Sequence, residues 1–224
     1  MNMNQPQPEA SQGKIEVKSD YFMMFSAPPL YVAEFPGDTD AIEKAMSTLE
    51  FRKSLNNDTT VNQYVLDEPE FEELKGFCNY CVEQYMHDVM HVTNHEMVIT
   101  QSWGNCTPKN HSHPKHYHLN SVVSGVYYVK SAENAPPIVF DTQRQDPFPI
   151  RPESDPSLGT NEFMNDSYSF PASTGHLILF PSTQHHYVPR NDGEEDRISL
   201  SFNSFPKLPV GSYDNSTLLT VDKL

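Results

Sequence analysis

The stretch HYHLNSVVSGVYY, residues 116–128, holds two histidines one residue apart and then a run of apolar and aromatic residues. Alternate side chains of a β-strand point to the same face, so His116 and His118 can offer both imidazoles to one metal ion. A distant segment, LILFPSTQHHYV at 177–188, adds His186. This spacing is typical of a mononuclear iron site in a β-barrel, with these three histidines as the metal ligands.

A second H-x-H lies just upstream, at His111 and His113. Pro114 follows it directly and is expected to break any strand there, because proline cannot donate to a sheet ladder. We therefore expect His111 and His113 to lie outside the metal site. An alternative interpretation of the whole histidine cluster is a solvated loop that binds metals adventitiously.

The segment RISLSFN, residues 197–203, alternates between polar and apolar side chains. If its apolar residues pack on the core, Arg197 and Ser199 must face elsewhere. Inside a barrel, an arginine needs an anion, and its planar guanidinium suits the distal carboxylate of a small diacid. Tyr128 shares the parity of His118, so its hydroxyl can assist from the facing strand. Solvent exposure of the polar stripe is the alternative.

The distribution of periodicities predicts the fold class. From Glu96 onward, short β-branched and aromatic runs are separated by proline-rich and polar loops. These runs are EMVITQSW, SVVSGVYYV, PPIVFDT, GHLILFP and RISLSFN. Helical periodicity precedes them and is not interleaved with them. We therefore predict a mainly β (α+β) fold, an antiparallel sandwich or jelly roll with N-terminal helices packed on one face.

The residues before this region predict an edge strand and two helices. Tyr21 to Phe35 is apolar but interrupted by prolines, which indicates short extended pieces at a sheet edge. The first helix is expected to be capped by Asp38 or Thr39 and to extend to about Leu55. The second is expected to be capped by Asp67, with apolar residues at helical spacing.

Two of the three cysteines, Cys78 and Cys81, fall on the apolar stripe of this second helix. We expect buried thiols there, because no second C-x-x-C follows to complete a metal site. Cys106 lies alone, so no disulfide framework is indicated. His87, His91 and His95 are expected to be surface histidines near the end of the helix.

The length of the chain suits one globular domain. The expected divisions are a disordered tail at 1–20, a single jelly-roll domain at 21–210 and a C-terminal tail at 211–224. Within the domain we expect helical support at 38–92, a barrel core at 96–206 and a lid-like loop at 141–174. That loop is dense in proline and polar residues and is long enough to be either a functional lid or disordered.

Composition excludes several classes of partner. Fifteen basic and thirty acidic residues give a formal charge of −15, which disfavours binding to duplex nucleic acid. No apolar run has the length of a signal peptide or of a membrane span of about 20 residues. We expect a cytoplasmic protein, in the host cytoplasm if the chain is viral, with no membrane partner.

At these residues the chain resembles the 2-oxoglutarate- and Fe(II)-dependent oxygenases, and among them a bacterial and bacteriophage subgroup with the signature H-x-H-x-N-S-x-x-S-G-V-Y-Y. The resemblance spans roughly residues 22–206. The segments that carry it are FSAPPLYVAEF, Ser102, Trp103, Asn105, the stretch 116–128, Phe180 to Ser182, His186, Val188 and 197–203.

The resemblance implies a double-stranded β-helix that holds Fe(II) at its open end. The implied metal ligands are His116, His118 and His186. The cosubstrate, 2-oxoglutarate, would chelate the metal while its far carboxylate meets Arg197. The other residues implied at the cosubstrate are Tyr128, Ser199 and Asn105.

The implied activity is hydroxylation of a C–H bond with oxidative decarboxylation of 2-oxoglutarate to succinate. Its small-molecule partners would be 2-oxoglutarate and O2, with ascorbate as an activator. The pair Tyr127 and Tyr128 after the H-x-H resembles the prolyl hydroxylases, so a peptidyl proline in a peptide or protein is a candidate substrate.

The chain departs from the wider superfamily at His118, where Asp or Glu is usual. Three imidazoles leave no anionic ligand to favour iron, which makes zinc more plausible. One alternative is therefore a three-histidine cupin-type dioxygenase or isomerase that works without 2-oxoglutarate. Another is a non-enzymatic, virion-associated binding protein. Arg197 favours the oxygenase, because a 2-oxoglutarate site accounts for an arginine at this distance from His186.

Overall fold

The computed structural model describes residues 29–93, 95–141, 153, 155, 157 and 166–220. The predicted tail at 1–20 and most of the predicted lid lie outside these residues. The α-helices are α1 (Thr39–Ser47) and α2 (Glu72–Met90), and two short 3-10 helices cover Val65–Asp67 and Pro69–Phe71. The strands are β1 (Tyr31–Glu34), β2 (Phe51–Arg52), β3 (Asp58–Thr60), β4 (Met97–Thr107), β5 (His113–His116), β6 (Val123–Lys130), β7 (Ile138–Asp141), β8 (Ser167–Phe170), β9 (His176–Pro181), β10 (His186–Val188) and β11 (Arg197–Pro206).

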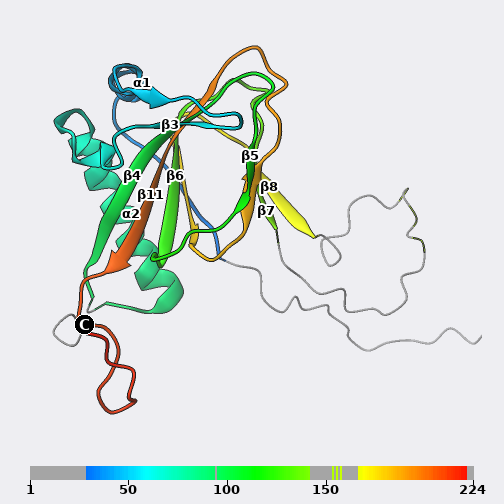
Figure 1. The fold of residues 1–224 in the computed structure, drawn as a ribbon. Helices are drawn as coiled ribbons and strands as arrows, with labels where there is room; N and C mark the ends of the chain where they lie inside the picture. The colour runs from blue at the N-terminus through cyan, green and yellow to red at the C-terminus, as the bar shows by residue number, and fades with distance from the viewer. Residues whose placement is uncertain are drawn as a thin grey trace, which may run out of the picture.

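Two antiparallel sheets make up the barrel (Figure 1). The larger sheet has seven strands in the order β1-β9-β6-β11-β4-β3-β2, and the smaller has four in the order β5-β10-β7-β8. An apolar cluster from strands of both sheets, including Tyr128, Phe140 and Phe180, fills part of the space between them. The predicted jelly roll is confirmed, with β1 at the sheet edge where the N-terminal extended segment was expected.

Helix α2 lies against the outer face of the larger sheet (Figure 1). Its buried stripe, with Leu74, Cys78 and Cys81, packs in one core with Leu200 and Phe202 of β11. The thiols of Cys78 and Cys81 are fully buried, as their apolar positions predicted. The described part of the chain contains no helix both long and apolar enough to cross a membrane.

The central strand β11 separates this outer core from the barrel interior. Its even-numbered residues, such as Phe202, face the helices, which leaves its odd-numbered residues on the inner face. The ring of Phe202 covers Gly125 of the neighbouring strand β6, and a Cβ at Gly125 would lie 2.2 Å from its Cζ. Glycine is therefore required there for the close approach of the ring.

The first predicted helix is shorter than expected. Asp38 caps it as predicted, with Oδ1 accepting hydrogen bonds from the backbone N–H groups of Asp40 and Ala41 at 3.0 and 3.1 Å. It ends at Ser47, and the predicted extension to about Leu55 is wrong. Strands β2 and β3 follow instead, because β3 pairs with β4 and extends the larger sheet. The predicted helical support at 38–92 thus also contributes two strands.

The second helix begins at Glu72, so the predicted cap at Asp67 is wrong. Pro69 explains the delay: the residue before a proline avoids helical geometry, and Glu68 is extended with ψ 141°. Asp67 instead pairs with Lys75, at 2.6 Å. The helix ends at Met90, near the predicted position.

Both ends of the predicted loop at 141–174 belong to strands. Asp141 ends β7, and Ser167–Phe170 forms β8, which pairs with β7. The predicted C-terminal tail is partly structured, since the backbones of Val210 and Leu219 exchange two hydrogen bonds of 3.0 and 2.8 Å and close a loop, red in Figure 1.

Candidate metal centre and anion pocket

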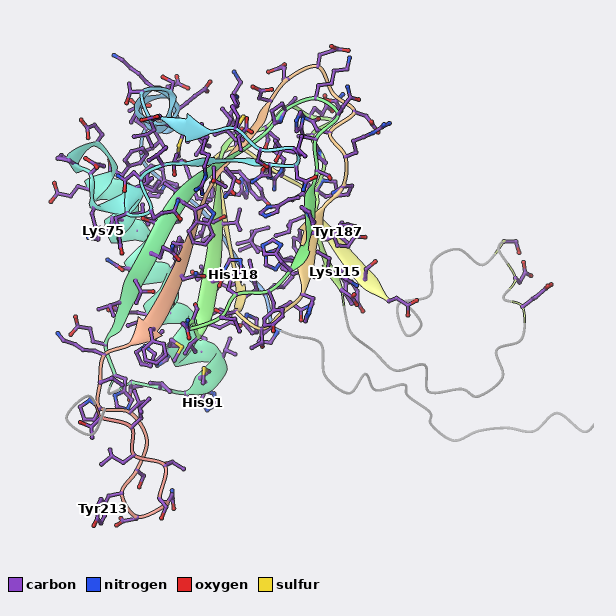
Figure 2. All side chains as sticks on the ribbon, viewed as in Figure 1. Lys75, His91, Lys115, His118, Tyr187 and Tyr213 are labelled. Atoms are coloured by element: carbon purple, nitrogen blue, oxygen red, sulfur yellow. The ribbon has the colours of Figure 1, made fainter. Side chains whose placement is uncertain are left out.

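The three histidines predicted as metal ligands meet between the two sheets, where Figure 2 labels His118. His116 ends β5 and pairs directly with His186 of β10. His118 follows in extended chain, and its backbone N–H donates to the carbonyl of Ser182 at 2.8 Å. One ring nitrogen of each histidine lies within 4.8 Å of the other two. This spacing allows the three side chains to share one metal ion.

Backbone carbonyl groups orient two of these rings. Nδ1 of His116 donates to the carbonyl of Pro114 at 2.8 Å, and Nδ1 of His186 donates to that of Gln184 at 2.9 Å. A carbonyl oxygen can only accept, so Nδ1 carries the proton in both rings. The Nε2 atoms are therefore left with free lone pairs for a metal.

Side chains orient the ring of the third histidine, His118. Nδ1 of His118 lies 2.5 Å from Oδ1 of Asn203. The Ser124 hydroxyl lies 3.0 Å from the same ring nitrogen and 2.9 Å from Asn203 Oδ1. It also lies 2.8 Å from the Ser182 hydroxyl. These residues therefore give His118 the same tautomer as the other two rings.

Burial keeps the three imidazoles neutral. It lowers the pKa of His116 and His118, and it lowers the pKa of His186 to about 2, with the nearby His116 adding to the effect. Desolvation disfavours the charged imidazolium. At neutral pH the rings thus do not need to lose a proton before they bind a metal.

Arg197, the first residue of β11, is buried at 3% exposure. Its Nη1 lies 3.5 Å from the Ser199 hydroxyl, and its Cζ lies 5.0 Å from the centre of the Tyr128 ring. Within the described residues, Arg197 Nε and the Tyr128 hydroxyl have no hydrogen-bond partner. A buried cation without a counter-ion is costly. The arrangement fits an anionic ligand that would supply the missing partner.

One cavity joins the histidines to this arginine. Of the predicted site residues, the three histidines, Asn105, Arg197 and Ser199 line it, and Tyr128 packs beside Arg197. None of the described residues that line the cavity is acidic. The cavity therefore offers a metal-binding end and a cationic end, with no carboxylate of the protein between them.

Asn105 is already engaged by its neighbours. Its Oδ1 accepts from Asn57 Nδ2 at 2.9 Å, and its Nδ2 donates to the Ser201 hydroxyl at 2.9 Å. Any contact with a cosubstrate would have to use the second N–H of the same amide.

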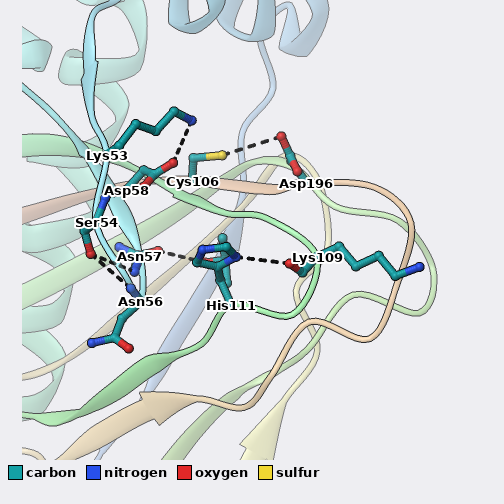
Figure 3. A network of polar contacts seen from close by, with 10 residues as sticks. Lys53, Ser54, Asn56, Asn57, Asp58, Cys106, Lys109, His111 and Asp196 are labelled. Atoms are coloured by element: carbon teal, nitrogen blue, oxygen red, sulfur yellow. Dashed lines mark hydrogen bonds and ion pairs between the residues drawn. The ribbon is translucent and has the colours of Figure 1, made fainter.

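His113 lies outside the group of three candidate metal ligands, as expected, but the expected strand break at Pro114 is wrong. Strand β5 contains Pro114 and is the edge strand of the smaller sheet, where a missing N–H is tolerated. The His113 ring stacks on His116 with centroids 4.3 Å apart, and it lines the cavity. Burial lowers its pKa to about 3. His111 does lie apart, in a polar network where its Nδ1 is 3.0 Å from the Lys109 carbonyl (Figure 3).

Trp103 is the single tryptophan of the chain, and no site role was predicted for it. It lines the cavity from β4, with its ring centroid 5.6 Å from that of His118. Alternate side chains of β4 face inward, so Trp103 shares the inner face with Asn105. This parity could have predicted its position.

A family model described as "Putative 2OG-Fe(II) oxygenase" matches residues 101–203. The matched range contains all seven predicted site residues. No curated protein matches the chain in sequence.

Solved structures share the fold at low sequence identity. HygX from Streptomyces hygroscopicus, determined with nickel, 2-oxoglutarate and hygromycin B, is 13% identical with a TM-score of 0.57, covering 82% of this chain and 85% of its own. A Pseudomonas putida prolyl-4-hydroxylase is 9% identical with a TM-score of 0.52, covering 79% and 92%. A Trichoplax adhaerens prolyl hydroxylase in complex with a hypoxia inducible factor peptide is 15% identical with a TM-score of 0.51, covering 79% and 83%.

Proposed function

We propose that the chain is a 2-oxoglutarate- and Fe(II)-dependent oxygenase, and that it hydroxylates a C–H bond with His116, His118 and His186 as the metal ligands. Bound Fe(II) and 2-oxoglutarate supply the oxidising chemistry. The balanced reaction takes R–H, O2 and 2-oxoglutarate to R–OH, succinate and CO2. One oxygen atom enters the product and the other enters succinate.

The buried guanidinium of Arg197 is the observation that carries this proposal. It has no carboxylate partner among the described residues, and it shares a cavity with three neutral histidines. A dicarboxylate can bind this cation at one end and the metal at the other. A three-histidine dioxygenase that works without 2-oxoglutarate gives no reason for an unpaired arginine there.

The protein's own residues position the reactants. Hydrogen bonds at Nδ1 hold the metal-binding rings, while Arg197, Ser199 and Tyr128 are proposed to bind the far carboxylate. Val126 and Ile138 line the cavity with apolar surface and limit the access of water. We propose that residues 21–210 form the single catalytic domain and that the enzyme acts in the cytoplasm.

We propose a peptidyl proline as the substrate. Two of the structural neighbours are prolyl hydroxylases, and one of them was solved with a peptide. The pair Tyr127 and Tyr128 after the H-x-H supports the same class. Both tyrosines are fully buried, Tyr128 beside Arg197 and Tyr127 in the outer core, so neither would touch a peptide.

Aerobic turnover tests the proposal. Protein incubated with Fe(II), ascorbate, 2-oxoglutarate and a set of proline-containing peptides should form one succinate for each 2-oxoglutarate consumed. Mass spectrometry should find a peptide heavier by one oxygen atom at proline. Absence of succinate from iron-loaded protein would contradict the oxygenase activity. Succinate formation that no peptide stimulates would instead count against the peptidyl substrate alone.

A further inference from the structure

His113 is the one histidine of the cavity that the metal site does not use. We infer that it binds the 2-oxoglutarate cosubstrate, beside Arg197, and that it is not a metal ligand. This inference rests on the proposed function.

The geometry separates His113 from the metal ligands. The ring nitrogens that lie within 4.8 Å of one another belong to His116, His118 and His186, and His113 is not among this group. Its ring lies nearly flat on that of His116, with an interplanar angle of 22°. Both rings line the same cavity.

The hydrogen bonds also distinguish His113 from the three proposed metal ligands. Each proposed metal ligand has its Nδ1 held by a carbonyl oxygen, of Pro114, Gln184 or the Asn203 side chain. No hydrogen bond joins the His113 ring to any residue in the described part of the chain. An imidazole carries at least one N–H donor in either protonation state. The His113 side chain is half-buried and lines the cavity, so a ligand bound there can accept a hydrogen bond from this donor.

The position of His113 along the sheet places it away from the metal. On β10, His186 pairs with His116, and Val188, two residues further on, pairs with His113. Val188, His113 and Arg197 all line the same cavity.

Arg197 Nε and the Tyr128 hydroxyl have no hydrogen-bond partner among the described residues, and Arg197 and His113 line the same cavity. A carboxylate accepts several hydrogen bonds, so one anion can satisfy more than one of these donors. His113 would add a donor to a carboxylate oxygen of the bound cosubstrate and fix its orientation.

Two variants test the inference. His113→Phe keeps a flat ring over His116 but removes both nitrogens, and His113→Gln keeps an N–H donor. We expect His113→Phe to weaken 2-oxoglutarate binding about 10- to 100-fold. We expect His113→Gln to recover part of that loss. The measurement is anaerobic calorimetry of 2-oxoglutarate binding to Mn(II)-loaded protein, with Mn(II) affinity measured on the same samples.

Mn(II) affinity should stay at the wild-type value in both variants, and His111→Phe should change neither affinity. If His113→Phe binds 2-oxoglutarate like the wild type, the inference is wrong. It is also wrong if His113→Phe or His113→Gln loses Mn(II), since His113 would then serve the metal. Failure of the wild type itself to bind 2-oxoglutarate would overturn the proposed function, and this inference with it.

Discussion

Arg197→Met should abolish 2-oxoglutarate binding and, at the same time, stabilise the ligand-free protein. The buried guanidinium has no carboxylate partner in the described chain, so replacing it with an apolar side chain removes a desolvation cost. We expect the melting temperature of the metal-free protein to rise by about 2–4 °C. The same change removes the charge-assisted hydrogen bonds to the cosubstrate, and we expect affinity to fall at least about 100-fold.

Calorimetry of 2-oxoglutarate binding and thermal unfolding measure the two effects on one preparation. Arg52→Met is the matched control, because Arg52 is exposed on the short strand β2 and should affect neither quantity. A lower melting temperature combined with unchanged 2-oxoglutarate affinity would assign Arg197 a structural role and contradict the proposed anion pocket.

His118→Ala should remove the metal. It deletes one of the three proposed nitrogen ligands and removes one of the two hydrogen-bond partners of Asn203 Oδ1, leaving the Ser124 hydroxyl. Changes to the groups that merely orient a ligand cost about 10- to 100-fold in metal affinity, so loss of the ligand itself should exceed about 100-fold. Metal content after anaerobic loading and dialysis, measured by elemental analysis, gives the result.

His111→Ala is the control for this variant, since His111 belongs to the other H-x-H and lies in a separate network (Figure 3). It should keep one metal ion per chain. If His118→Ala retains one metal ion per chain, His118 is not a metal ligand and a different residue completes the site.

The surroundings of His118 match its departure from the usual carboxylate, because they too are uncharged. The wider superfamily has a carboxylate at this position, whereas here a neutral imidazole is held by the neutral amide of Asn203. None of the described residues that line the cavity is acidic. A bound dianion would therefore be the main source of negative charge at the metal, which suits a dicarboxylate cosubstrate.

Much of the fold and of the site geometry could be predicted from strand periodicity. The alternation of residues 197–203 indicated which side chains of β11 face inward, and the spacing of His116 and His118 indicated that their rings share a face. Both signals are local, because the period of a strand is fixed by its own backbone. The structure brings the predicted side chains to one cavity.

The features that were not predicted depend on distant partners. Pro114 was expected to break a strand, but β5 is an edge strand, and edges are defined only by the complete sheet. Strands β2 and β3 were also not predicted. They follow the first helix and depend on sheet pairing, of β3 with β4 and of β2 with β3. The presence of His113 in the cavity was not predicted for the same reason.

The most direct test of the whole account is the dependence of 2-oxoglutarate binding on the metal in the wild-type protein. Under anaerobic conditions, calorimetry should show one 2-oxoglutarate per chain when Mn(II) is bound, and much weaker binding when the protein is metal-free. Absence of 2-oxoglutarate binding to protein that carries one Mn(II) per chain would contradict the account and favour a three-histidine dioxygenase.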